Sequence, residues 1–113
     1  MRTTATGHNA EAAVASYLAS NGFKILGRNW RTRWCEIDII ANNNKIIYFI
    51  EVKYRLSELH GSGFEYITSH KLNQIKFAAR FWNAQNNWDG DYRIIAAEVS
   101  GLDYAIIELV EID

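Results

Sequence analysis

The chain has 113 residues, of which 49% are hydrophobic and 13% aromatic, so residues 1–113 have the length and apolar content of a single domain with one packed core. It contains no run of about 20 apolar residues, and residues 1–9 lack the apolar stretch of a secretory signal, which predicts a cytoplasmic protein without a membrane segment. The single cysteine, Cys35, excludes an internal disulfide, and no Cys/His spacing typical of structural zinc is present.

The formal net charge of -1 conceals an uneven distribution along the chain. Residues 1–88 contain eleven Lys and Arg against six Asp and Glu, a balance of +5, whereas residues 89–113 contain one basic residue against seven acidic ones, a balance of -6. The basic residues of segment 1–88 are compatible with a polyanion site on one face of the protein. They are equally compatible with an ordinary solvated surface on which the acidic residues lie on the outer faces of strands.

The first half of the chain predicts one helix followed by three strands. Residues 9–20 use good helix formers and precede Asn21-Gly22, a common helix stop. Three segments rich in Ile, Phe, Tyr and Trp are predicted as strands: 23–30, 34–41 and 45–53. Asn42-Asn43-Asn44 predicts a hairpin turn between the last two, because asparagine tolerates the left-handed backbone that such turns need.

The second half predicts a helix and two further strands. Residues 69–86 have helical periodicity, and residues 92–99 and 104–112 have strand composition. The resulting order α-β-β-β-α-β-β predicts a mixed α/β domain with helices packed on a central sheet. Gly61 and Gly63 lie in the connection before the second helix, where functional loops are common.

Acidic side chains are predicted to gather on one face of two neighbouring strands. Because side chains alternate along a strand, the two acids of Glu36-Ile37-Asp38-Ile39 should point one way and its isoleucines the other, and Glu51 should share a face with Lys53. An even number of loop residues in the asparagine turn would bring Asp38 to the face of Glu51, whereas an odd number would separate them.

Two carboxylates this close repel each other unless a cation compensates. Lys53 is one such cation, and Mg²⁺, for which Mn²⁺ can substitute, is the other, because it commonly binds through one or two carboxylates plus a substrate phosphate. A metal that activates water and a lysine that stabilises developing oxyanions are the parts needed for phosphodiester hydrolysis. The structural alternative is a surface ion pair between Glu51 and Lys53.

Glu11 lies in the middle of the apolar stripe of the first helix, which Val14, Ala15 and Leu18 also form. An acid on that stripe either joins the acidic site or complements the positive end of the helix dipole. Both interpretations of Glu11 stay open.

An ordered set of short motifs resembles the YraN-type family of endonuclease-like proteins over nearly the whole chain. These motifs are Gly7-x-x-x-Glu11 with Tyr17-Leu18, Gly22-Phe23, Asn29-Trp30-Arg31, Glu36-Ile37-Asp38-Ile39-Ile40 and Phe49-Ile50-Glu51-Val52-Lys53-x-Arg55, continued by Gly61 and Lys71. Two positions depart from the general pattern: Cys35 replaces the glycine that this family has before Glu-Ile-Asp, and Ile37 stands where the superfamily name has proline.

The resemblance implies the PD-(D/E)xK, or restriction-endonuclease-like, fold, related to archaeal Holliday junction resolvases. This is an αβββαβ core with a mixed central sheet flanked by helices, here with an extra C-terminal strand. The resemblance assigns Mg²⁺ binding to Asp38 and Glu51 and the catalytic lysine role to Lys53. Glu11 is similar in position to the helix-one glutamate of the resolvase-like branch, which makes it a further catalytic and metal-binding candidate.

Four basic residues are predicted to contact nucleic-acid phosphates: Arg31, Arg33, Arg55 and Lys71. For Lys71 the alternative is a solvated lysine at the start of a helix. Trp30 or Trp34 could stack on an unpaired base, although strand aromatics more often belong to a core.

Three functions are compatible with these features. The first is a metal-dependent endonuclease acting on branched or nicked DNA, the second a nucleic-acid-binding module that does not cut, and the third a protein-interaction module on the same fold. A two-fold homodimer would place two sites on two strands, and the apolar residues of the last strand are candidates for its interface: Ile106, Ile107 and Leu109.

Overall fold

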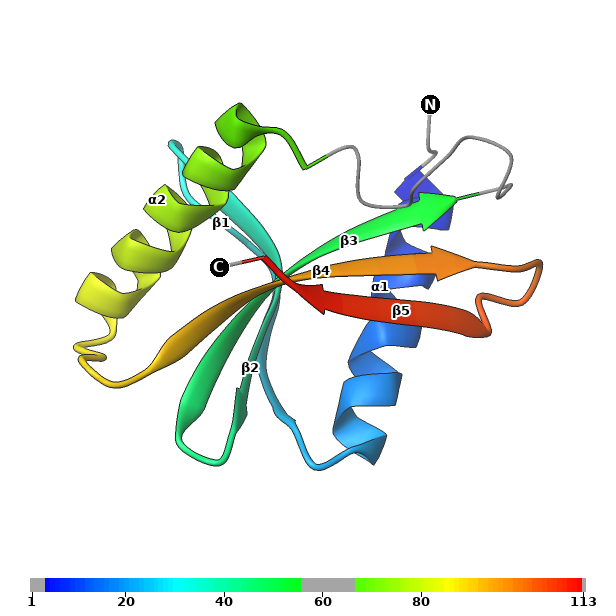
Figure 1. The fold of residues 1–113 in the computed structure, drawn as a ribbon, viewed down its shortest axis with the longest axis horizontal. Helices are drawn as coiled ribbons and strands as arrows, with labels where there is room; N and C mark the ends of the chain where they lie inside the picture. The colour runs from blue at the N-terminus through cyan, green and yellow to red at the C-terminus, as the bar shows by residue number, and fades with distance from the viewer. Residues whose placement is uncertain (1–3, 56–66, 113) are drawn as a thin grey trace.

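The computed structural model describes residues 4–55 and 67–112, which form a five-stranded sheet with one helix on each face (Figure 1). Helix α1 (Thr4–Ser20) covers one face, and helix α2 (Ser69–Gln85) covers the other. Gly61 and Gly63, predicted to lie in a functional loop, fall outside the described residues.

The strands lie in the sheet in the order in which they occur along the chain, β1-β2-β3-β4-β5. Their bounds are β1 Lys24–Arg31, β2 Glu36–Asn43, β3 Ile46–Arg55, β4 Tyr92–Ser100 and β5 Ile106–Glu111. Only β3 and β4 pair in parallel, and α2 makes the crossover between them, as parallel neighbours require. The predicted mixed αβββαβ core with an extra C-terminal strand is confirmed.

Most predicted boundaries agree with the structure to within about three residues, and the largest difference is at the first helix. Helix α1 begins at Thr4 rather than at residue 9, so it includes Gly7. Gly7 is buried, which shows that packing overrides the poor helix propensity of glycine. At the last strand, Tyr104 has a φ of 61°, a left-handed angle outside the strand region, and β5 begins two residues later.

Two apolar clusters, one on each sheet face, hold the helices in place. On the α1 face, helix residues Val14 and Leu18 pack with Ile39 and Ile50 from the two central strands. On the α2 face, Phe49 is fully buried and packs in a cluster with Ile40, Ile47, Ala78 and Ala79. Each helix buries its apolar stripe against its own side of the sheet, which fixes where its polar residues can reach.

The β2–β3 hairpin closes with a two-residue turn, Asn44-Lys45, whose φ angles are 54° and 66°. Two positive φ angles are typical of the type I′ turn favoured in two-residue hairpins. Asn42 and Asn43 belong to β2, so the prediction that all three asparagines form the turn is wrong. The even loop gives a continuous register from Asn43–Ile46 to Ile39–Ile50.

Replacing Lys45 with glycine should stabilise the hairpin. A non-glycine residue in the left-handed region destabilises the folded state by about 1 kcal/mol. Glycine avoids this strain but loses more conformational entropy on folding, which cancels part of the gain. We expect the free energy of unfolding of Lys45→Gly to rise by about 0.5 kcal/mol in urea denaturation. Gly22, with a φ of 90°, is the opposite control: Gly22→Ala should lose about 1 kcal/mol. A less stable Lys45→Gly protein would show that the lysine side chain contributes more than the backbone strain costs.

The sheet ends at β5, whose free edge carries two of the three predicted dimer residues in exposed positions. Ile106 and Leu109 are 50% and 37% exposed. Ile107 packs against the α1-side cluster and is therefore a core residue rather than an interface residue.

Candidate active site

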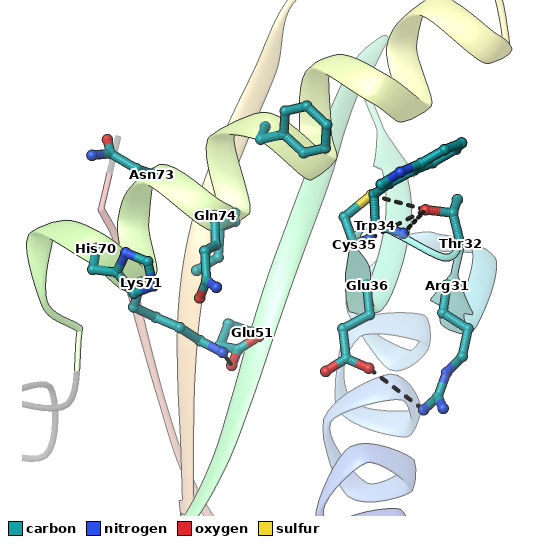
Figure 2. A pocket seen from close by; sticks show the side chains of 12 residues that line it. Arg31, Thr32, Trp34, Cys35, Glu36, Glu51, His70, Lys71, Asn73 and Gln74 are labelled. Carbon is teal, nitrogen blue, oxygen red and sulfur yellow. Dashed lines mark hydrogen bonds and ion pairs between the residues drawn. The ribbon is translucent and has the colours of Figure 1, made fainter.

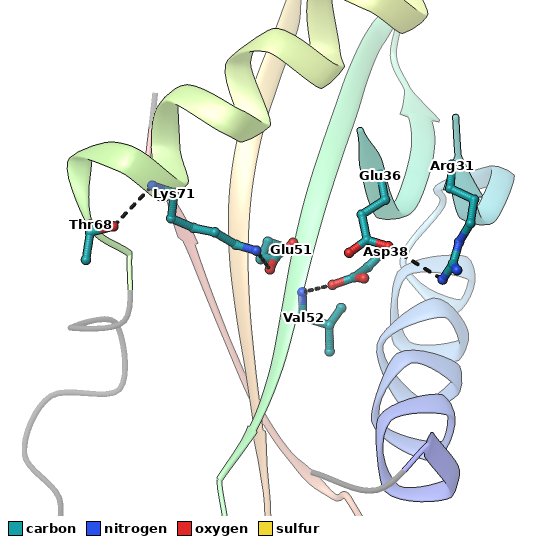
Figure 3. Close-up of polar contacts among 7 residues, drawn as sticks. All are labelled: Arg31, Glu36, Asp38, Glu51, Val52, Thr68 and Lys71. Carbon is teal, nitrogen blue, oxygen red and sulfur yellow. Dashed lines mark hydrogen bonds and ion pairs between the residues drawn. The ribbon is translucent and has the colours of Figure 1, made fainter. Parts of the chain in front are cut away.

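Strands β2 and β3 bring Asp38 and Glu51 to neighbouring positions of the sheet. The backbone pairing between the strands is continuous as far as Ile39–Ile50, and beyond it the Asp38 carboxylate replaces the main-chain partner. Oδ2 of Asp38 accepts a hydrogen bond of 2.7 Å from the backbone N–H of Val52, as Figure 3 shows. This charge-assisted bond fixes the Asp38 carboxylate against β3, one residue from Glu51.

The alternation of side chains along β2 is interrupted at Asp38. Ile37 packs on the α2 face and Ile39 on the α1 face, so the prediction that the two isoleucines share a face is wrong. The paired strand β1 has the same interruption, since Asn29 has a φ of 50° and its neighbours Arg28 and Trp30 contact opposite faces. A left-handed residue breaks the two-residue period of a strand. Asp38 therefore lies where the strand changes face.

Helix α2 supplies the cation of the site. Nζ of Lys71 lies 2.9 Å from Oε2 of Glu51 (Figure 3). The first turn of α2 is held by Thr68, whose hydroxyl oxygen accepts a hydrogen bond of 3.1 Å from the Lys71 N–H. The structure thus places the Lys71 ammonium on an acidic side chain, rather than in the separate phosphate-contacting position expected from the sequence.

Three carboxylates act on this one ammonium, and we call Glu36, Asp38 and Glu51 the acid cluster. Burial lowers the pKa of Lys71, but the hydrogen bond and charge of Glu51, with the charges of Asp38 and Glu36, outweigh it and hold the pKa above its usual 10.5. Asp38 and Glu51 thus share the Lys71 ammonium, and a cation between two close carboxylates lowers their repulsion.

Arg31 and Glu36 form an ion pair at the rim of the site, with Nη2 and Oε2 3.5 Å apart. Both side chains are about two-thirds exposed, at 68% and 64%. Exposed pairs of this kind contribute about 0–1 kcal/mol, so an incoming phosphate can exchange with Glu36 at little cost. Arg31 therefore remains a phosphate-contact candidate, and Glu36, which the sequence left without a role, belongs to the site.

A pocket of about 560 Å³ opens above the acid cluster, between the N-terminal half of α2 and the β1–β2 connection (Figure 2). Its volume lies within the usual range of ligand sites. The lining residues are Arg31, Thr32, Trp34, Cys35, Glu36, Glu51, His70, Lys71, Asn73, Gln74, Ile75 and Phe77. Acidic, basic, amide and aromatic groups thus meet in one cavity.

Lys53 and Arg55 continue β3 beyond Glu51 but do not line the pocket. Lys53 is exposed and lies two residues after Glu51, which puts it on the same side of the strand. Nη1 of Arg55 lies 3.6 Å from Oε2 of Glu98 on β4, and both side chains are nearly buried. The structure therefore gives Arg55 an internal carboxylate partner in place of the expected phosphate.

Glu11 and Arg33 also lie outside the pocket lining. Glu11 is 4% exposed on the α1 side, where its Oε1 accepts a hydrogen bond of 3.1 Å from Nε of Arg28. This ion pair explains why an acid lies on the apolar stripe of α1. The guanidinium of Arg33 lies 5.3 Å from the centre of the Trp34 ring, at the edge of the pocket.

Within residues 4–55 and 67–112, no group of three or more His, Cys, Asp or Glu side chains is arranged to hold a metal ion. A metal here would bind through Asp38 and Glu51 and complete its shell with water and phosphate, which is how Mg²⁺ commonly binds in phosphate-processing sites. The all-oxygen donors fit Mg²⁺ or Mn²⁺.

The mixed sheet with a helix on each face is an α/β domain, and its strands β2 and β3 carry neighbouring carboxylates. A family model described as "Uncharacterised protein family UPF0102" matches residues 10–108, and the chain belongs to this family. The resemblance to the YraN-type family noted from the sequence is thereby confirmed.

Three bacterial relatives described as UPF0102 proteins match this chain over most of both lengths. A UPF0102 protein of Sulfurihydrogenibium sp. is 39% identical over 102 residues, covering 89% of both chains. One from Chlorobium chlorochromatii is 35% identical over 113 residues, covering 98% of this chain and 88% of the relative. One from Vibrio parahaemolyticus is 34% identical over 101 residues, covering 86% of this chain and 84% of the relative.

Among solved structures, a complex of EndoMS with double-stranded DNA aligns with a TM-score of 0.47 and 22% identity. The alignment covers 76% of this chain and 34% of that one. As for membranes, neither α1 nor α2, within the part of the chain that the structure describes, has the length and hydropathy of a membrane span.

Proposed function

We propose that this protein is an Mg²⁺-dependent endonuclease that hydrolyses phosphodiester bonds in DNA, with branched or nicked structures as its substrates. The observation that carries the proposal is an open pocket lined by Glu36 and Glu51 of the acid cluster, with Glu51 paired to Lys71 and Asp38 fixed beside them by the Val52 N–H. A surface ion pair needs no such concentration of acids, because each further carboxylate raises the electrostatic cost.

The residues of the chain divide the work of this reaction. Asp38 and Glu51 hold the divalent ion, and Mn²⁺ can replace Mg²⁺ on the same oxygens. The bound ion supplies a Lewis acid that makes water nucleophilic and offsets phosphate charge. Arg31 orients the phosphate at the rim, and Lys53 or Lys71 donates to the oxygens on which charge develops.

The cleavage test compares the parent protein with Glu51→Gln on branched, nicked, paired and single-stranded DNAs and on matched RNAs. The parent should cut DNA in Mg²⁺ or Mn²⁺ and not in EDTA. Glu51→Gln should lose at least about a hundredfold in rate, since it removes a metal ligand without changing shape. Glu108→Gln, an exposed residue of β5, is the matched control and should cut normally. Equal rates in all three proteins would identify a contaminating nuclease.

The second candidate is a nucleic-acid-binding or protein-interaction module on the same fold that does not cut. It is favoured by the ion pair in which the Lys71 ammonium already compensates the charge of Glu51. Retained DNA binding without cleavage in any divalent metal would establish the binding module. Failure to bind nucleic acid would leave the protein-interaction module.

Lys71→Met should strengthen divalent metal binding severalfold. The Lys71 ammonium is paired with Glu51, so a metal on Glu51 must displace it, and removing one positive charge deepens the negative potential of the acid cluster. Calorimetric Mn²⁺ titration measures this effect directly. Lys24→Met removes an exposed lysine at the far end of β1 and should leave the affinity unchanged. An unaltered affinity in Lys71→Met would show that its ammonium does not compete with the metal.

A further inference from the structure

Exposed aromatic side chains form one wall of the pocket. Trp34 is 65% exposed and Phe77 is 45% exposed, and both line the pocket. Phe81 lies between them, with ring centroids 5.9 Å from Trp34 and 6.1 Å from Phe77, and Trp30 packs on Phe81 from the core side at 6.1 Å. We call the two lining rings, Trp34 and Phe77, together with Phe81 and Trp30, which support them from outside the pocket lining, the aromatic wall.

The indole of Trp34 is held in its exposed position by specific contacts. Its backbone N–H donates to Oγ1 of Thr32 at 3.0 Å, and the Cys35 N–H donates to the same oxygen at 3.2 Å. Arg33 covers the ring at 5.3 Å, and Phe81 contacts it at a tilt of 41°. A rigid aromatic surface exposed to water has a hydrophobic cost that a planar ligand would recover.

The surroundings of the aromatic wall indicate the chemistry of its ligand. Arg31 and His70 provide cationic or polar groups at the rim, and Asn73 and Gln74 provide amide donors and acceptors. Amide groups pair with base edges, and basic groups bind phosphates. A planar ring joined to a phosphate matches both halves of the pocket, whereas a purely apolar protein segment would leave the amides and charges unpaired.

We propose that the aromatic wall and the pocket bind an unstacked nucleobase, so that the preferred substrate is DNA with an unpaired nucleotide next to the phosphate at the acid cluster. This inference rests on the proposed function, because it takes the acid cluster as the place of the phosphate. Bases stack on aromatic side chains in a sequence-tolerant way, so the site would select an unpaired nucleotide rather than a particular base.

The test measures DNA binding without cleavage. Fluorescence anisotropy, with Ca²⁺ replacing Mg²⁺, compares a fully paired duplex with the same duplex containing one unpaired 2-aminopurine. The parent should bind the second duplex about tenfold more tightly, and 2-aminopurine fluorescence should fall on stacking. Trp34→Ala and Phe77→Ala should each lose most of this preference while binding the paired duplex nearly as before. Trp34→Phe, which keeps a ring, should retain much of it.

Tyr17→Ala is the matched control, because Tyr17 is an aromatic residue of α1 with the same 45% exposure as Phe77 and lies outside the pocket. Equal affinity of the parent for both duplexes would overturn the inference even if the protein cuts DNA. A preference for the unpaired nucleotide without cleavage in Mg²⁺ would uphold the inference and overturn the nuclease proposal. No binding to either duplex would overturn both.

Discussion

Asp38→Asn is expected to lose at least about a hundredfold in Mg²⁺-dependent cleavage while remaining nearly as stable as the parent. Asparagine keeps an oxygen that can accept from the Val52 N–H, so the hydrogen bond of 2.7 Å survives in weaker, neutral form. The loss of one negative charge from the acid cluster offsets this weakening, because the remaining carboxylates repel each other less. Charge, and not shape, is what the substitution removes.

Asp38→Ala separates the structural contribution of this residue from its catalytic one. It removes the carboxylate that accepts from the buried backbone N–H of Val52, which should cost about 1–3 kcal/mol of unfolding free energy in addition to the loss of cleavage. Cleavage rate and thermal unfolding are measured on the same preparations. Asp103→Asn is the control, since Asp103 also accepts a backbone N–H, from Ala105 at 3.3 Å, but lies in an exposed turn. Full cleavage by Asp38→Asn would remove Asp38 from the metal site.

The sequence predicted the hairpin between β2 and β3, because asparagine tolerates the positive φ of a tight turn. It left the relation between Asp38 and Glu51 open, because that relation depends on whether the turn has an even or an odd number of residues. The interruption at Asp38 could not be predicted in this way, because it depends on the single left-handed residue Asn29 on the neighbouring strand. Asparagine is compatible with that angle but does not require it.

The contact between Lys71 and Glu51 was missed for a different reason. Helical periodicity identifies the apolar side of α2 but not where its first turn lies over the sheet, which depends on the parallel crossover between β3 and β4. The one signal in the sequence was a cation at a helix N-terminus, where it opposes the helix dipole. Glu51 supplies the compensating charge.

The catalytic and metal-binding role of Glu11 stays a prediction, and its contact with Arg28 is an additional feature that the sequence did not indicate. Its place on the apolar stripe of α1 correctly indicated burial, but a buried carboxylate has two common partners, a metal or a basic side chain. The structure supplies Arg28, which lies after the bulge between Ile25 and Gly27 in β1. Irregular strand register of this kind is not encoded in a simple alternation of apolar and polar residues.

Phe49→Ala should be the most destabilising of these substitutions, with a loss of about 3–5 kcal/mol in the free energy of unfolding. Phe49 is fully buried and contacts Trp82 and Tyr92 edge-on at ring-centroid distances of 5.7 and 5.8 Å. Removing the ring leaves a cavity between β3 and α2 and deletes both aromatic contacts, each of which contributes about 0.5–1.5 kcal/mol beyond its buried area. The thermal midpoint should fall by roughly 10–20 °C.

The same substitution tests how the acid cluster is assembled. Phe49 lies two residues before Glu51, on the same side of β3. Its ring partner Trp82 belongs to α2, the helix that carries Lys71. If packing at Phe49 sets the position of α2, Phe49→Ala should also bind Mn²⁺ and DNA more weakly at temperatures where it is fully folded. Urea denaturation with an unchanged m-value, followed by binding at low temperature, separates the loss of stability from the loss of binding.

Phe77→Ala is the stability control: it removes a half-exposed ring from α2 and should lower the free energy of unfolding by no more than about 1 kcal/mol. A Phe49→Ala protein that loses stability but binds metal and DNA normally would show that α2 is positioned by its connections rather than by this core.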